Sequence, residues 1–177
     1  EGHPGVGKSS LVQEFSKYVS LHKGFFVAGK FDQHQQNIPL HGVLQALHGL
    51  MHWLLSLPES QLQVWRGSIL EAVPQNAGFL IEILPELEKV IGVQPPVIDL
   101  SPLEAHNRFL LVCSNFINLF ASANSPLVIF LDDLQWCDVT TLELINYMVG
   151  SSRSSNIMLI GAYRPNDLIP GLPFLTA

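Results

Sequence analysis

The sequence has little positive charge and no long hydrophobic run. It contains nine Lys and Arg against fifteen Asp and Glu in 177 residues, for a formal net charge of −6, and the basic residues do not cluster. A nucleic-acid surface needs clustered positive charge, so we expect no direct nucleic-acid partner. No apolar run approaches the roughly 20 residues that a bilayer-spanning helix needs, so we expect no membrane contact.

Cysteine is also scarce. Cys113 and Cys137 are too few for a disulfide framework and lack C-x-x-C spacing. Reduced thiols in or near a core suit a cytoplasmic protein, which is the location we expect. No signal peptide is visible, but the chain starts at Glu1 rather than Met, so this absence has little weight.

What the chain does have is a glycine-rich start, EGHPGVGKSS, which fits the spacing G-x-x-x-x-G-K-[ST]. In such a loop the backbone N–H groups wrap nucleotide phosphates, the Lys approaches the β- and γ-phosphates, and the Ser hydroxyl binds Mg²⁺. The alternative is a glycine turn that matches by chance. The residues expected to bind the nucleotide are Gly2, Gly5, Val6, Gly7, Lys8, Ser9 and Ser10, with Ser9 also a magnesium ligand.

Hydrophobic periodicity predicts helices that alternate with strands. Helices are expected over residues 9–21, 40–55, 62–70, 77–84, 101–121 and 139–149, and strands over 25–28, 127–131 and 157–163. The run Leu127–Leu131 has no alternation, which is typical of a strand buried on both faces of a parallel sheet. Ser101-Pro102-Leu103-Glu104 is a capping box, and Asp138 can cap the helix that follows it. The order predicts an α/β fold with a parallel sheet.

An acidic pair ends the most hydrophobic strand. In P-loop NTPases a strand of this kind, here LVIFLDD, is the usual partner of the phosphate loop. Asp132 would hold Mg²⁺ through its water shell, and Asp133 would orient or deprotonate the attacking water. Two solvated carboxylates at a strand end are the alternative.

Arg164 follows the next predicted strand. The carboxyl ends of neighbouring parallel strands converge on one edge, where ligands bind, so an Arg there can reach a γ-phosphate. The alternative is a surface arginine that pairs with Asp167.

Together these motifs resemble a STAND-type ATPase of the AAA-related P-loop class. The loop GHPGVGKS, the strand ending LDDLQW and the strand IMLIGAYR carry the likeness. The match is closer to the module of large sensor kinases, through GKFDQ, IEILPELE, IGVQPPV, EAHNRF and PLVIFLDDLQWCD. The resemblance implies one partial P-loop domain over 1–177, with the phosphate loop at 2–9, a helical insert at 39–122, the acidic strand at 127–133 and a sensor strand at 157–164. It also implies that the strand before the loop and the later lid are missing.

The expected function is an ATP-binding switch within a multidomain signalling protein, with ATP and Mg²⁺ as ligands. Its partners would be neighbouring domains of the same polypeptide, with possible nucleotide-dependent self-association. Lys8, Asp133 and Arg164 would be catalytic, and hydrolysis would be slow because an Asp base is shorter than the usual Glu. A scaffold with a vestigial site is the alternative; a phosphotransferase would need a basic lid that the sequence does not show.

Other residues are given lesser roles. His48 and His52 have the i, i+4 spacing of metal ligands, but no third ligand is evident, so ordinary helix histidines are preferred. Lys30 and Asp32 follow the first strand and could touch nucleotide or a partner.

Overall fold

The computed structural model describes residues 8–35, 38–98, 100–151 and 155–164, and the glycine loop Gly2–Gly7 lies outside them. The chain divides into two compact units. The sheet unit comprises Glu1–Ala46 and Phe120–Ala177, and the helical unit comprises Leu47–Leu119. The helical unit is therefore inserted into the sequence of the sheet unit.

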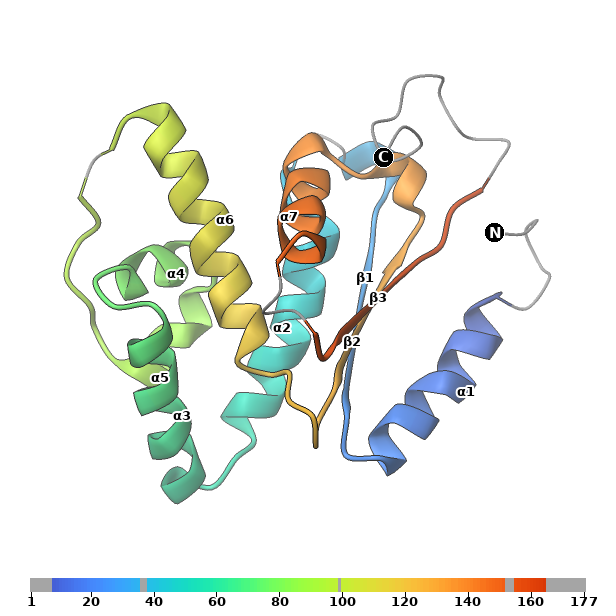
Figure 1. Cartoon of the computed structure of the whole chain (residues 1–177), viewed down its shortest axis with the longest axis horizontal. Helices are drawn as coiled ribbons and strands as arrows, with labels where there is room; N and C mark the ends of the chain where they lie inside the picture. Colours follow the sequence, from blue (N-terminus) through green and yellow to red (C-terminus); the bar gives the residue numbers. More distant parts are fainter. Residues whose placement is uncertain (1–7, 36–37, 99, 152–154, 165–177) are drawn as a thin grey trace. The chain divides into compact units, whose positions relative to one another are not determined.

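The sheet unit is built on three parallel strands in the order β1-β2-β3 (Figure 1). β1 is Phe25–Lys30, β2 is Leu127–Asp132 and β3 is Ile157–Gly161. The register pairs Lys30 with Asp132 and Leu131 with Gly161, so the three strands end at one edge. The central strand is apolar from end to end because both its faces are covered: Leu127 to Leu131 are all buried.

Helices flank this sheet on both faces (Figure 1). α1 (Lys8–Leu21) lies on one side, and the start of α2 (His41–Leu55) and α7 (Val139–Val149) lie on the other. β1 and α2 approach closely at two glycines, since a Cβ placed on Gly29 would lie 1.7 Å from the carbonyl oxygen of Gly42. Any larger residue at Gly29 would force strand and helix apart.

Asp138 fixes the helices of that second face to each other. Its side chain accepts hydrogen bonds from the N–H and hydroxyl of Thr141, at 3.0 and 2.6 Å, and from the N–H of Leu40 at 3.0 Å. The predicted N-cap of α7 is thus confirmed, and the same carboxylate also holds the entry to α2.

The helical unit contains the rest of α2 and four further α-helices. They are α3 (Glu59–Ala72), α4 (Ala77–Ile83), α5 (Glu88–Ile91) and α6 (Pro102–Asn118). α6 begins with the predicted capping box, in which Glu104 Oε2 accepts from the N–H and hydroxyl of Ser101 at 3.1 and 2.6 Å. These two bonds, the hydroxyl first, lower the pKa of Glu104 from its ordinary value. The core of the unit includes Leu54, Leu84 and Phe116, each fully buried.

The structure confirms the α/β fold and corrects some boundaries. α3 runs over Glu59–Ala72 rather than 62–70, because Pro58 precedes the helix as its N-cap and does not shorten it. β3 ends at Gly161, two residues earlier than expected, so Arg164 belongs to the segment after the strand.

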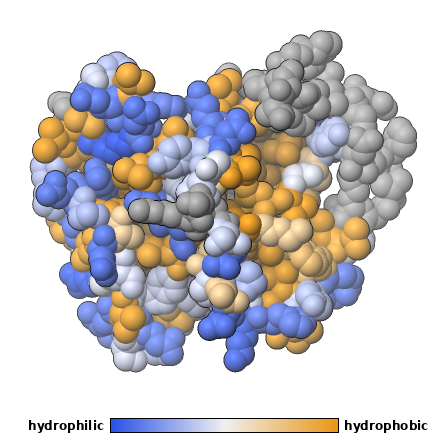
Figure 2. Space-filling model, in the orientation of Figure 1, coloured by the Kyte–Doolittle hydropathy of each residue, from blue (hydrophilic) through white to orange (hydrophobic). Residues whose placement is uncertain are grey.

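Apolar side chains remain exposed on the sheet unit, as the orange surface in Figure 2 shows. Met158 of β3 is 50% exposed, and Leu11 and Leu21 of α1 are 73% and 81% exposed. β3 is also an edge strand among the described strands. In the part of the chain that the structure describes, no helix is both long and apolar enough to span a bilayer.

Candidate functional site

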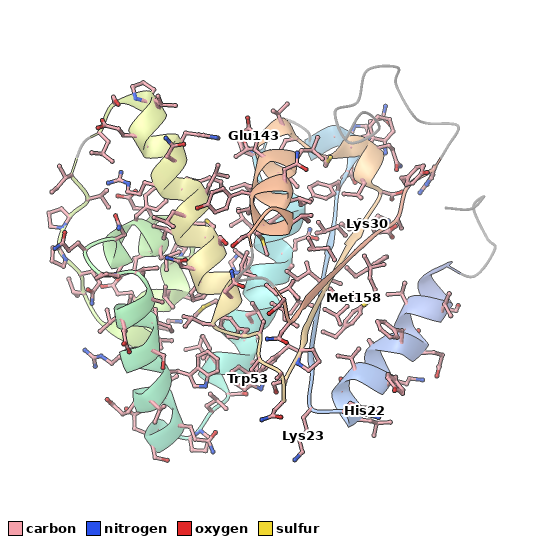
Figure 3. The ribbon with its side chains drawn as sticks, viewed as in Figure 1. His22, Lys23, Lys30, Trp53, Glu143 and Met158 are labelled. Carbon is pink, nitrogen blue, oxygen red and sulfur yellow. The ribbon has the colours of Figure 1, made fainter. Side chains whose placement is uncertain are left out.

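The carboxyl ends of the three strands bring charged residues from distant parts of the sequence together. Lys30 is the last residue of β1 (Figure 3), Asp132 is the last residue of β2, and Asp133 follows it directly. Arg164 arrives after β3, and α1 begins at the end of the sheet toward which the strands run (Figure 1). We call the four residues Lys30, Asp132, Asp133 and Arg164 the strand-end cluster.

The backbone explains why the segments after β2 and β3 meet. The N–H of Ala162 donates to the carbonyl of Leu131, and the N–H of Leu134 donates to the carbonyl of Ala162, both at 2.9 Å. These bonds extend the β2–β3 contact beyond the last ladder pair. Asp133 lies between them in the left-handed conformation, with φ 55° and ψ 44°. Asp tolerates this region better than most residues do, and the turn directs its side chain inward.

Asp133 is the centre of the cluster and is buried, at 6% exposure. Its Oδ1 lies 3.0 Å from Arg164 Nε and accepts from Gln135 Nε2 at 3.0 Å. Its Oδ2 accepts from Arg164 Nη2 at 3.3 Å and lies 3.5 Å from Lys30 Nζ. Both carboxylate oxygens of Asp133 are therefore engaged, each by one hydrogen bond and one ion pair.

The two cations are more exposed than the carboxylate that they pair with. The side chains of Arg164 and Lys30 are 42% and 60% exposed, against 9% for Asp133. Because the cations are the exposed members of these pairs, an anion from solvent could reach them, whereas the buried carboxylate would need a replacement partner. The alternative expectation for Arg164, a pair with Asp167, involves a residue outside the described part of the chain.

Gln135 is a site residue that the sequence analysis missed. It is 1% exposed, and while its amide nitrogen donates to Asp133, its Oε1 accepts from the N–H of Arg164 at 3.1 Å. One side chain thus positions both members of the ion pair. The available signal was a polar residue two positions after the acidic pair, inside a segment that remains in the core.

Asp132 has a different environment. Its Oδ1 accepts from the N–H of Asp133 at 3.0 Å, and no hydrogen bond from another described residue reaches its Oδ2. A carboxylate with a free oxygen is a suitable ligand for Mg²⁺, which binds through one or two carboxylates and keeps several waters. The residues present therefore fit the expected magnesium role.

The structure describes only some of the residues that are predicted to bind the phosphates. α1 begins at Lys8, as the motif requires, and Ser9 and Ser10 form its first turn. Gly2, Gly5, Val6 and Gly7 lie outside the described residues. Their assignment to phosphate binding stays a prediction.

The residues with lesser expected roles also have different environments in the structure. Lys30 joins the cluster, whereas among the described residues Asp32 accepts only from the N–H of His34, at 2.8 Å. His48 Nδ1 lies 3.4 Å from Glu86 Oε1. The described residues contain no group of three His, Cys, Asp or Glu side chains arranged for a metal ion.

The two cysteines are free thiols, and the pKa of each is raised above its ordinary value. Burial raises the pKa of the Cys113 thiol to about 12. Burial first, and then the neighbouring Asp138 carboxylate, raise the pKa of Cys137 to about 11. Both thiols are protonated at neutral pH, so neither is an activated nucleophile.

Comparison with known proteins identifies the family. A family model described as AAA ATPase domain matches residues 1–160. This chain belongs to the AAA ATPase domain family. The match spans the phosphate-loop motif and three residues of the strand-end cluster, Lys30, Asp132 and Asp133, whereas Arg164 lies beyond it.

Two curated relatives are histidine kinases by name. The chain is 34% identical over 151 residues to hybrid signal transduction histidine kinase G of Dictyostelium discoideum, covering 85% of this chain and 4% of that protein. It is 26% identical over 193 residues to histidine protein kinase 1 of Candida albicans, covering 93% of this chain and 8% of that protein. The chain thus spans less than a tenth of the length of either relative. No solved structure matches it significantly.

Proposed function

We propose that this AAA ATPase domain is a STAND-type module that binds Mg-ATP and hydrolyses it slowly, as a switch in a multidomain signalling protein. The observation that carries the proposal is the meeting of Asp133 with Arg164 and Lys30 at the carboxyl ends of three parallel strands. This edge is where α/β sheets bind ligands, and α1 runs antiparallel to the strands, so that its start at Lys8 is the end of the helix nearer to this edge (Figure 1).

Each residue of the strand-end cluster has a distinct proposed role. Arg164 and Lys30 would bind phosphate oxygens, Arg164 distinguishing a triphosphate from a diphosphate. Asp132, together with Ser9, would hold Mg²⁺, which supplies charge neutralisation of the phosphates. Lys8 and residues 2–10 would contact the phosphate chain.

In the arrangement observed, both oxygens of Asp133 are engaged by Arg164, Lys30 and Gln135, so a water molecule would compete with these partners for the carboxylate. We interpret this arrangement as the resting form. A bound γ-phosphate would compete for the two cations and release carboxylate oxygens for a water molecule. Hydrolysis would be slow for two reasons. The cations must first move from Asp133 to the γ-phosphate, and an Asp side chain is shorter than the Glu that usually acts as the base.

The signalling context rests on the relatives. Both are named as histidine kinases, and this chain corresponds to a small part of each. We propose that nucleotide state changes how the module contacts neighbouring domains of its polypeptide, or a second copy of itself.

Titration of the full-length protein with fluorescent ATP, with and without Mg²⁺, tests the binding claim. Lys8→Ala should weaken Mg-ATP binding at this site by at least about tenfold, or about 1.4 kcal/mol. The matched control is Lys17→Ala on the same helix, whose exposed ammonium pairs with Glu14 at 2.6 Å. It should leave binding unchanged, and the difference between the variants reports this site even if other domains also bind ATP.

The same titration separates the switch from the scaffold. Equal binding by wild type and Lys8→Ala would contradict a nucleotide site at the glycine loop. A wild-type protein without Mg-dependent binding would favour a scaffold with a vestigial site.

A further inference from the structure

The helical unit contains a cavity of about 380 Å³ that plays no part in the proposed nucleotide site. It lies between the end of α3, the turn before α4, the start of α4, and an extended segment that follows α5. We call this segment, residues 92–98, the wall segment. The lining side chains are mostly apolar; the lining residues are Leu70, Val73, Gln75, Ala77, Gly78, Gln94, Pro95, Pro96 and Ile98.

The wall segment is fixed at its start by a turn. Gly92 has φ 73°, a conformation that favours glycine and redirects the chain at the end of α5. Next, the Gln94 amide nitrogen donates to the carbonyls of Ile91 and Gly92, at 2.9 and 3.4 Å. Both bonds hold Gln94 against the helix end that precedes it.

The middle and the end of the wall segment are fixed as well. The Pro95 carbonyl packs on Gly78 so closely that a Cβ on that glycine would lie 2.5 Å away. At the far end, Arg108 Nη1 donates to the Ile98 carbonyl at 3.1 Å, while the guanidinium lies 5.0 Å from the centre of the Phe79 ring. Pro95 and Pro96 restrict the backbone between these points.

These attachments mean that the wall segment cannot fold down onto α3 and fill the space. The pocket is partly open to solvent, and ligand pockets are concave, mostly apolar and preformed. A volume of 380 Å³ is within the range of small-molecule pockets. A cavity of roughly 150 Å³ accepts benzene, so this one would accept a molecule of about two ring systems.

The lining also defines the chemistry of the ligand. None of the nine lining residues is charged, so an ionic ligand would lose its hydration without compensation. The amide nitrogen of Gln94 is used by the two carbonyls, and no hydrogen bond from another described residue reaches its amide oxygen. That oxygen is an available acceptor in a lining whose other residues, apart from Gln75, are apolar or glycine.

We propose that this cavity binds a neutral, largely apolar small molecule of about two ring systems that donates one hydrogen bond. The site lies within the helical unit and is independent of the proposed nucleotide function. It gives the module a second ligand of a different chemical class.

N-phenyl-1-naphthylamine is a suitable probe because it is neutral, has two aromatic ring systems and carries one N–H donor. The full-length protein should increase its fluorescence in a saturable titration. Leu70→Trp places a larger side chain on the cavity lining from a half-buried position and should weaken binding at least tenfold. Val93→Trp adds the same side chain at a position 83% exposed and outside this lining, and should bind the probe as the wild type does.

Two further measurements keep the proposal falsifiable. Thermal unfolding of both tryptophan variants checks that each is folded; if Leu70→Trp is not, Leu70→Phe replaces it. The sulfonated form of the probe, 8-anilino-1-naphthalenesulfonate, should bind at least tenfold more weakly than the neutral one. Equal binding of the two probes, or equal binding of the neutral probe to folded Leu70 and Val93 variants, would overturn the proposal.

Discussion

The sheet unit and the helical unit differ in the kind of group that they bury. Four polar residues are buried in the described structure, and three of them, Asp133, Gln135 and Thr141, belong to the sheet unit. The helical unit buries only Ser114 of this set and otherwise relies on apolar side chains. The sheet unit thus holds charge at a strand edge, while the helical unit encloses uncharged space. This difference suits them to ligands of opposite character.

The two units also differ in how their sequence is arranged. In the sheet unit, Asp138 binds the N–H of Leu40 across 98 residues, and Arg164 reaches Asp133 across 31. The helical unit is one continuous stretch, and its capping box joins residues three positions apart. We therefore expect substitutions in the apolar core of the helical unit, at the Asp138 cap and at the Ser101 cap to lower the free energy of unfolding by different amounts.

The largest effect should come from the apolar core of the helical unit. Phe116 on α6 is fully buried, so Phe116→Ala should lower the free energy of unfolding by about 3–5 kcal/mol through lost burial and an added cavity. Leu103→Ala on the same helix, 70% exposed, should change it by less than about 0.5 kcal/mol. Urea unfolding followed by tryptophan fluorescence measures both; similar values for the two would contradict this view of the core.

A smaller effect should separate the two helix caps. Asp138→Ala removes three hydrogen bonds, one of them to a distant part of the sheet unit, and should cost about 2 kcal/mol. Ser101→Ala removes the local hydroxyl bond to Glu104 at an exposed helix start, keeps the backbone N–H bond, and should cost about 1 kcal/mol or less. The same unfolding experiment compares them. A Ser101 variant that is the less stable of the two would break the proposed distinction between local and long-range caps.

Features with a local cause could be predicted from the sequence. The buried strand Leu127–Leu131 followed by two Asp residues predicts both a parallel sheet and an acidic edge, because burial on both faces removes the alternation. Ser101 to Glu104 and Asp138 predict helix starts, because a cap is satisfied within one turn. The family match confirms the AAA ATPase assignment that these motifs indicated.

Features that depend on tertiary contacts could not be predicted. Pro58 suggested a break, but the residues after it form a helix of 14 residues. Nothing local marks Gln135 as the residue that joins Asp133 to Arg164, since that role needs the segments after β2 and β3 to be adjacent. The cavity in the helical unit depends on contacts of Gly78 and Arg108 with the wall segment, at separations of 17 and 10 residues respectively. The proline-broken stretch gave no indication of it.

The central claim is that Arg164 exchanges Asp133 for a γ-phosphate, and Asp133→Asn tests it most directly. Asn keeps the size and tolerates the left-handed backbone but removes the competing charge. The matched control is Asp32→Asn, since Asp32 follows β1 but binds just one group in the described part of the chain, the N–H of His34. Calorimetric titration of the full-length protein should show Mg-ATP binding at least about fivefold tighter in Asp133→Asn, or about 1 kcal/mol, with Mg-ADP binding unchanged. An Asp133→Asn protein that binds Mg-ATP no more tightly than wild type and Asp32→Asn would contradict the account.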